Sequence, residues 1–177
     1  MAFVHFGAGR RRDRSRYNVL MKAYHARLLA PFAVLGIVTD GEFLVGIDFL
    51  PPGTPELAPQ NQAAEEVGAQ LRAYLADSAF RFDLPLAMRG TAFQTRVWQA
   101  LRNIPGGSTL RYGELAQRLH TAPRAVGRAC GTNPIPIVIP CHRVLAQNGL
   151  GGFMGGTGGD PLEIKRWLLA HEHFPLP

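Results

Sequence analysis

Residues 112–144 read YGELAQRLHTAPRAVGRACGTNPIPIVIPCHRV and decide how the C-terminal half of the chain folds. The stretch begins with apolar residues at helical spacing, which predict one short helix: Tyr112, Leu115, Ala116 and Leu119. Thr121 and Pro123 open a second helix, which Gly131 ends. Two short helices joined by a tight turn are typical of a helix-turn-helix, although any compact helix pair has the same spacing.

The two faces of the second helix favour DNA binding. At about 100° per residue, one face is apolar and points into a core: Val126, Ala129 and Cys130. The opposite face is basic and almost without bulk: Arg124, Gly127, Arg128 and Gly131. Its backbone could therefore approach a nucleic acid closely, whereas an ordinary solvated face more often carries Glu, Lys and Gln.

The composition agrees with a nucleic-acid partner and excludes several other classes. A formal net charge of +6 over 177 residues favours a polyanion. Cys130 and Cys141 are the only cysteines, too few for a disulfide framework or a four-thiolate zinc site, and they suit a reducing cytoplasm. The histidines lack metal-ligand spacing, and no apolar run approaches the ~18 residues that a membrane span needs. We expect a cytoplasmic monomer without metal, cofactor or membrane partner.

The remaining sequence predicts three regions: a basic tail (1–16), an α/β scaffold domain (17–89) and a DNA-binding, reactive domain (90–177). The tail, rich in arginine from Gly7 to Arg16, is either a solvated start or a non-specific aid to DNA binding. In the scaffold domain, the stretch Leu28 to Val38 is apolar and is interpreted as a strand. The Asp40-Gly41 pair predicts a hairpin with the apolar run Phe43 to Phe49.

Helix-capping residues and an alternating apolar pattern predict the remaining helices and strand of the two domains. Asn61 caps a helix whose apolar positions are Ala64, Val67, Leu71, Tyr74 and Leu75. Alternating apolar residues from Phe80 to Met88 predict a half-buried strand. Thr91 and Gln94 form a capping box before a third helix, and Asp160 with Glu163 forms one before the last helix.

The most informative segment is 133–144, NPIPIVIPCHRV, an apolar run fenced by prolines that ends at Cys141. A cysteine in apolar surroundings normally has a raised pKa and is inert, so a core cysteine beside a surface histidine is the plain alternative. Adjacent side chains on an extended chain point to opposite faces. His142 could therefore activate Cys141 only if the chain turns there, or through a bridging water.

The strings RAVG, NPIPIVI and PCHRV together strongly resemble the 6-O-alkylguanine-DNA alkyltransferases. The resemblance covers Thr91 to about His173 and is only architectural over the first half. It implies a ribonuclease-H-like α/β domain, with a small antiparallel sheet plus a helix. It also implies a mainly α C-terminal domain with a winged-helix-like helix-turn-helix. The implied activity is irreversible, single-turnover transfer of an alkyl group from double-stranded DNA to a cysteine.

The resemblance also implies a role for each matching residue. Cys141 matches the alkyl acceptor, His142 the base that acts through a water, and Glu172 the carboxylate that orients this histidine. Asn133 matches the residue bracing the active-site turn, and Tyr112 the tyrosine that contacts a phosphate and donates a proton toward guanine. Arg124 matches the arginine that enters the base stack, within a DNA-contacting set completed by Ala125, Gly127, Arg128 and Tyr112. Val144 matches a carbonyl that reads the guanine amino group.

Several alternatives stay open. Glu172 falls near a helix C-terminus, where a carboxylate is disfavoured; an exposed ion pair with Lys165 or Arg166 would account for it as well as His142 does. The aromatic residue expected at the pocket lip corresponds to either Phe153 or Met154. Rival functions are a damage sensor, which lacks the acceptor cysteine, a sequence-reading regulator, and a cysteine hydrolase. The regulator needs base-reading side chains and the hydrolase a base facing the thiol, and neither is evident.

Overall fold

The structure, a computed structural model, describes residues 23–153 and 160–175. The basic tail and Met154, which the sequence analysis singled out, lie outside the described residues. The elements in chain order are β1 (Ala26–Ala30), β2 (Ala33–Asp40), β3 (Phe43–Leu50), α2 (Gln62–Ala76), α3 (Ala92–Arg102), β4 (Leu110–Arg111), α4 (Tyr112–Arg118), α5 (Pro123–Gly131), the 3₁₀ helix η1 (Cys141–Arg143), β5 (Val144–Leu145) and α6 (Pro161–His171).

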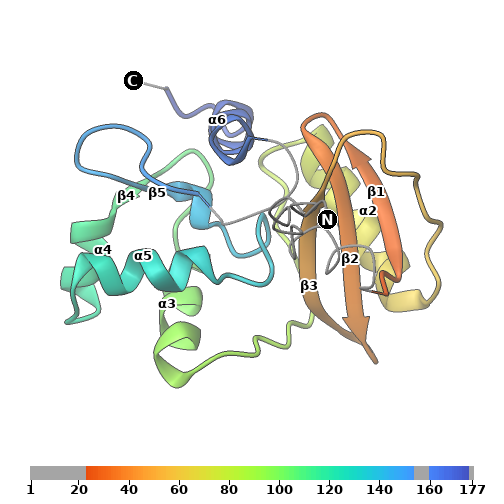
Figure 1. Ribbon diagram of the computed structural model, residues 1–177, viewed down its shortest axis with the longest axis horizontal. Coiled ribbons are helices and arrows are strands. Elements are labelled where there is room, and N and C mark those ends of the chain that lie inside the picture. The colour runs from red at the N-terminus through yellow and green to blue at the C-terminus, as the bar shows by residue number, and fades with distance from the viewer. Residues whose placement is uncertain (1–22, 154–159, 176–177) are drawn as a thin grey trace, which may run out of the picture.

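An antiparallel sheet in the order β1-β2-β3 forms the first half (Figure 1). The hairpin predicted at Asp40-Gly41 is confirmed, because Asp40 pairs with Phe43 and Gly41 adopts a positive φ of 58°. The prediction of one strand from Leu28 to Val38 is wrong. The chain reverses after Ala30, which pairs with Ala33, at a turn that contains Pro31. Proline has no N–H to donate to a ladder, so the apolar run becomes two strands.

Helix α2 packs against the sheet, and its predicted cap is confirmed. The Asn61 side chain accepts a hydrogen bond from the Ala64 N–H at 2.8 Å. The expected apolar face is the buried one, with Val67, Leu71 and Tyr74 each at most 2% exposed. The helix therefore holds Tyr74 in the interior, facing the second half of the chain.

The strand predicted from Phe80 to Met88 is wrong. This segment has only an isolated parallel bridge between Leu44 and Leu86. Leu44 donates to the Pro85 carbonyl at 2.9 Å and accepts from Ala87 at 3.0 Å. Pro85 has no N–H, which limits the ladder, although Leu84 is buried between two exposed neighbours as alternation requires.

The second half is mainly helical, with α3, α4 and α5 grouped on the side of the molecule away from the sheet (Figure 1). The capping box of Thr91 and Gln94 on α3 is confirmed. Helices α4 and α5 pack together across a turn in which His120 has a positive φ of 51°. Trp98 of α3 donates to the Ala129 carbonyl of α5 at 2.8 Å, which fixes α5 against the core.

Two smaller features close the fold. Strands β4 and β5 pair in parallel, with Leu110 opposite Val144. Asp160 caps α6 by accepting from the Leu162 N–H, but Glu163 forms an ion pair with Arg166 instead of completing a capping box. Among the described helices none is long and apolar enough to cross a membrane.

Candidate active site and DNA-facing surface

The segment between α5 and η1 is a tight, buried loop braced by Asn133. The Asn133 Oδ1 accepts from the Ile135 N–H at 3.1 Å, and its Nδ2 donates to the Ile139 carbonyl at 2.7 Å. Ile137, only 1% exposed, has a φ of 73°, which a β-branched residue rarely adopts. Strained backbone persists only where its surroundings determine it, so the brace holds Cys141 at a defined place.

Cys141 opens η1 and lines a cavity of about 360 Å³. The other lining residues come from α4, α5 and the 152–153 segment: Tyr112, Gly127, Cys130, Gly131, Gly152 and Phe153. Phe153 therefore takes a place in the cavity wall, where the sequence left a choice between Phe153 and Met154. Cys130 lies on the buried side of α5, as expected, yet it also reaches the cavity.

The thiol of Cys141 is held protonated by its surroundings. Burial raises its pKa, while the Asn133 side chain, the Lys165 ammonium and nearby backbone N–H groups lower it; burial wins. A buried thiol becomes a nucleophile only when a base removes its proton.

His142, the next residue in the chain, is buried and held by a carboxylate. The chain turns through η1, and Nε2 of His142 lies 2.9 Å from Oε1 of Glu172. Burial lowers the pKa of His142 more than the Glu172 carboxylate raises it, so the imidazole is neutral. The carboxylate partner assigns the proton to Nε2. This leaves Nδ1 as an acceptor; it is buried and without a hydrogen-bond partner among the described residues.

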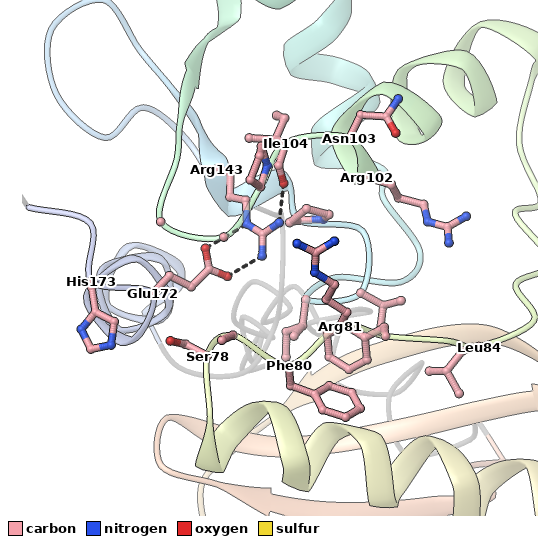
Figure 2. A pocket seen from close by; sticks show the side chains of 18 residues that line it. Ser78, Phe80, Arg81, Leu84, Arg102, Asn103, Ile104, Arg143, Glu172 and His173 are labelled. Atoms are coloured by element: carbon pink, nitrogen blue, oxygen red, sulfur yellow. Dashed lines mark hydrogen bonds and ion pairs between the residues drawn. The ribbon is translucent and has the colours of Figure 1, made fainter.

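Glu172 is fixed from several directions. Arg143 donates to Oε2 from Nε and to Oε1 from Nη2, each at 2.8 Å, and to the Ile104 carbonyl from Nη1 at 2.5 Å (Figure 2). Burial raises the pKa of Glu172, but hydrogen bonds and charges from His142 and Arg143 outweigh it and hold the pKa well below its usual range. The alternative of an exposed pair with Lys165 or Arg166 is wrong. The sequence did not predict that Arg143 is a partner of Glu172.

The pair of Arg143 and Glu172 also forms part of the wall of a second cavity, of about 680 Å³ (Figure 2). This cavity lies between the 78–84 segment of the first half and the 102–107 segment that follows α3. Cys141 is not among its lining residues. The Cys141 thiol and the Glu172 carboxylate therefore line different cavities, and His142 contacts the carboxylate.

Lys165 is the functional candidate that the sequence analysis missed. Its side chain is fully buried, and Nζ donates to the carbonyls of Val144, Leu150 and Gly152 at 2.7, 2.6 and 3.2 Å. Burial lowers its pKa to about 8, against the opposing effect of the two thiols. Lys165 shares the buried face of α6 with Leu168 and Leu169, and this spacing was the available signal.

Tyr112 lines the cavity, and Val144 follows η1 directly. The Tyr112 hydroxyl donates to the Gly152 carbonyl at 3.1 Å beside the cavity. Burial, followed by the two thiols, raises the pKa of Tyr112, so the hydroxyl stays protonated. The Val144 carbonyl already accepts from Lys165, and its second lone pair remains for another donor.

The outer face of α5 matches the expectation from its sequence. Arg124 and Arg128 are exposed, and Ala125 and Gly127 are half-buried. A Cβ at Gly127 would lie 4.0 Å from the Tyr112 ring, so this glycine sits where α5 meets the cavity. In the ranges 23–153 and 160–175, no group of three His, Cys, Asp or Glu side chains is placed to hold a metal.

Comparison with known proteins shows which protein family the chain belongs to. Residues 92–174 match the family model described as 6-O-methylguanine DNA methyltransferase, DNA binding domain. A methylated-DNA–protein-cysteine methyltransferase of Shigella flexneri is 34% identical over 89% of this chain and 99% of its own length. The chain belongs to the methylated-DNA–protein-cysteine methyltransferase family.

Further members of the family share the whole architecture. The Haemophilus influenzae methyltransferase is 40% identical over 86% of this chain and 87% of its own length. Mycobacterium tuberculosis OGT, solved in complex with DNA, superposes with a TM-score of 0.71 at 39% identity. The match covers 82% of this chain and 90% of the mycobacterial one. A small antiparallel sheet domain followed by a helical part is therefore the fold of the methyltransferase family.

Proposed function

We propose that Cys141 of this DNA-repair methyltransferase accepts the alkyl group of 6-O-alkylguanine in double-stranded DNA. Membership of the methyltransferase family supports the class of reaction, methyl transfer from DNA to a protein cysteine. The observation that supports Cys141 as the acceptor is the position of its thiol in a cavity beside helix α5, directly before a neutral histidine held by a buried carboxylate.

His142 is the base in this proposal. Its unpartnered Nδ1 takes the thiol proton through one bridging water. Meanwhile Nε2 keeps its own proton, which it donates in a hydrogen bond to Glu172. The imidazolium that forms is stabilised by the Glu172 carboxylate, which Arg143 holds in a bidentate pair. Asn133 and the buried loop position the thiol, and the Lys165 ammonium favours its charged form.

Transfer then follows as a single displacement. The Cys141 thiolate attacks the alkyl carbon, a C–S bond forms, and the bond from carbon to the guanine oxygen breaks. The bonding electron pair moves onto guanine, where the protonated Tyr112 hydroxyl donates a hydrogen bond toward the ring. The Val144 carbonyl reads the guanine amino group. Of the two alternatives for the lip of the pocket, Phe153 and Met154, Phe153 takes this role in the proposal, because it lines the cavity.

The base reaches the cavity only after leaving the duplex. The extruded base leaves a gap in the base stack of the duplex, and this gap must be filled. The exposed side chain of Arg124, at the start of α5, fills it. Ala125, Gly127 and Arg128 present a low, basic surface to the DNA backbone. Affinity is expected to fall steeply with salt, because phosphate neutralisation dominates such binding.

Finer assignments belong to the same proposal. The boundaries are a basic tail over 1–16, a ribonuclease-H-like scaffold over 17–89 and a reactive domain over 90–177, with β4, β5 and the α4–α5 pair forming a winged-helix-like unit. The protein acts as a monomer without a cofactor. The free thiols of Cys130 and Cys141 support a reducing compartment such as the cytoplasm.

The rival functions have less support. A damage sensor lacks the acceptor thiol, which is present here as Cys141. A sequence-reading regulator needs side chains that contact base edges, and α5 exposes two arginines with glycines around them. A cysteine hydrolase needs an oxyanion hole as well as a base beside the thiol, and the described residues of this cavity offer no constellation of that kind.

The test is Cys141→Ala, measured by gel shift and by transfer on the same preparation. The variant is expected to bind methylated duplex as the wild type does and to transfer no methyl group. Cys130→Ala is the matched control, since it removes the other thiol of the same cavity and is expected to retain transfer. Transfer by Cys141→Ala, or its loss in a well-folded Cys130→Ala, would contradict the assignment.

A further inference from the structure

The first half of the chain contributes a side chain to the buried cluster around Glu172. The hydroxyl of Tyr74, on α2, donates to Oε1 of Glu172 at 2.8 Å, across 98 residues of sequence. The same oxygen contacts Nε2 of His142 at 2.9 Å and accepts from Arg143 at 2.8 Å. Tyr74 is 1% exposed, so its hydroxyl has no access to bulk water as an alternative partner.

Tyr74 is held in this position by both its ring and its backbone. The ring packs against Phe82 at 5.4 Å and edge-on against His171 at 5.1 Å between centroids. The Tyr74 carbonyl also accepts from Nε2 of His171, the last residue of α6, at 2.7 Å. Tyr74 therefore contacts the C-terminal end of α6 at two points, its carbonyl with His171 and its hydroxyl with Glu172, and the hydroxyl has little freedom to leave the carboxylate.

We propose that Tyr74 is a positioning residue for the transfer reaction, which acts through Glu172 on His142. The inference rests on the proposed function, in which His142 is the base. It assigns to the sheet domain a direct part in the chemistry, beyond support of the fold. Outer hydrogen bonds to a carboxylate that orients a histidine set both the orientation and the basicity of the ring.

The physical effect has a definite sign. A hydroxyl that donates to Oε1 withdraws negative charge from the oxygen that stabilises the imidazolium. Removing it leaves that charge on Oε1 and raises the pKa of His142. The charged or titratable groups that act on His142 are Glu172, Arg143 and Lys165, with Cys141 next to it in the chain, and the variant removes none of them.

The direct test is Tyr74→Phe, which keeps the ring packing and removes only the hydroxyl. The rate of methyl transfer to Cys141 is expected to fall about five-fold, the typical worth of one buried hydrogen bond. The rising limb of the pH–rate profile is expected to move to higher pH, because His142 stays protonated to a higher pH. Because His142 and Glu172 titrate as a coupled pair, the pH–rate profile gives one apparent midpoint for the pair.

Two control variants separate positioning from packing. Phe80→Leu loosens the packing of Phe82 and leaves both ring contacts of Tyr74 in place, and it is expected to lower the melting temperature without moving the pH midpoint. Tyr24→Phe removes a tyrosine hydroxyl that donates to Asp48 on the sheet and is expected to change neither rate nor midpoint. A double-mutant cycle gives a third readout. In a Glu172→Gln background, Tyr74→Phe is expected to have no further effect on the rate, because its effect passes through the carboxylate.

A second substitution keeps the inference testable if Tyr74→Phe fails to fold. Site-specific 3-fluorotyrosine at position 74 is a more acidic donor of nearly the same size, and is expected to move the pH midpoint to lower pH. An unchanged rate and midpoint in folded Tyr74→Phe, or an unchanged midpoint with fluorotyrosine, overturns the role of Tyr74 and leaves the acceptor assignment standing. No transfer by the wild-type protein overturns both.

Discussion

Replacing Glu172 with Gln probes the electrostatic centre of the site. The side chain is 1% exposed, and each contact that it makes with Tyr74, His142 and Arg143 needs an acceptor on residue 172. A glutamine of the same shape must turn its NH₂ group toward either the Tyr74 and His142 side or the Arg143 Nε side. At least one donor then faces another donor, and the Arg143 guanidinium, 13% exposed, loses its counter-charge.

The expected loss follows from the burial of this pair. Removing one partner of a buried, hydrogen-bonded ion pair costs about 3–5 kcal/mol of unfolding free energy. In a chain of this length each kcal/mol lowers Tm by roughly 2–4 °C, so Glu172→Gln is expected to melt roughly 6–20 °C below the wild type. Since the folded pKa of Glu172 is depressed, its stabilisation is present above the ordinary carboxyl pKa. It is lost as pH falls through and below about 4, where the difference between the two proteins is expected to shrink.

The assay is chemical denaturation followed by the fluorescence of Trp98 and Trp167, at pH 7 and again near pH 3.5. Glu163→Gln is the matched control on the same helix, since its ion pair with Arg166 is exposed and is expected to be worth less than about 1 kcal/mol. An unfolding free energy of Glu172→Gln within about 1 kcal/mol of the wild type at pH 7 would refute the reasoning.

Three further outcomes follow from the geometry of the site. With a pKa near 8, Lys165 loses its charge above that pH, so wild-type transfer is expected to decline on the alkaline side, and Lys165→Met to transfer slowly without that decline; an identical alkaline limb in both proteins would argue against this role. Arg124→Ala is expected to slow repair of duplex DNA far more than transfer from free methylated guanine, and equal slowing would place Arg124 in the pocket instead. Gel-shift affinity for duplex is expected to drop by an order of magnitude or more between low and physiological salt, and a flat response would count against phosphate contacts.

Local signals in the sequence were sufficient for much of the fold. Asn61 and Thr91 mark helix starts because their side chains satisfy backbone N–H groups within one turn. Asp40-Gly41 marks a hairpin because glycine tolerates the positive φ of the turn. The errors arose where a proline inside an apolar run interrupts the strand that the pattern predicts. The run from Leu28 to Val38 divides at Pro31, and the 80–88 segment lacks a ladder because Pro85 cannot donate to one.

The site residues also divide into those that the sequence indicated and those that only the structure shows. Cys141, His142 and Asn133 fall in one contiguous motif, and the family resemblance paired Glu172 with His142, whereas its position at the end of α6 alone left other partners open. Tyr74 and Arg143 could not be found as partners of Glu172, because their contacts depend on how α2, η1 and α6 meet in space. Lys165 was considered only as a possible partner of Glu172 in an exposed ion pair, although its helical position already put it on the buried face.

The central claim is that Cys141 takes one alkyl group and keeps it. A methyl thioether has no good leaving group and no carbonyl for water to attack, so no route returns the thiol. Intact-mass measurement over time, with excess methylated-guanine duplex and peptide mapping at the end, tests this directly. The account predicts a single burst that adds one methyl group per active molecule, located on the peptide that contains Cys141, and then a flat line. Demethylation that continues past one equivalent, or a methyl group found elsewhere than on Cys141, would contradict it.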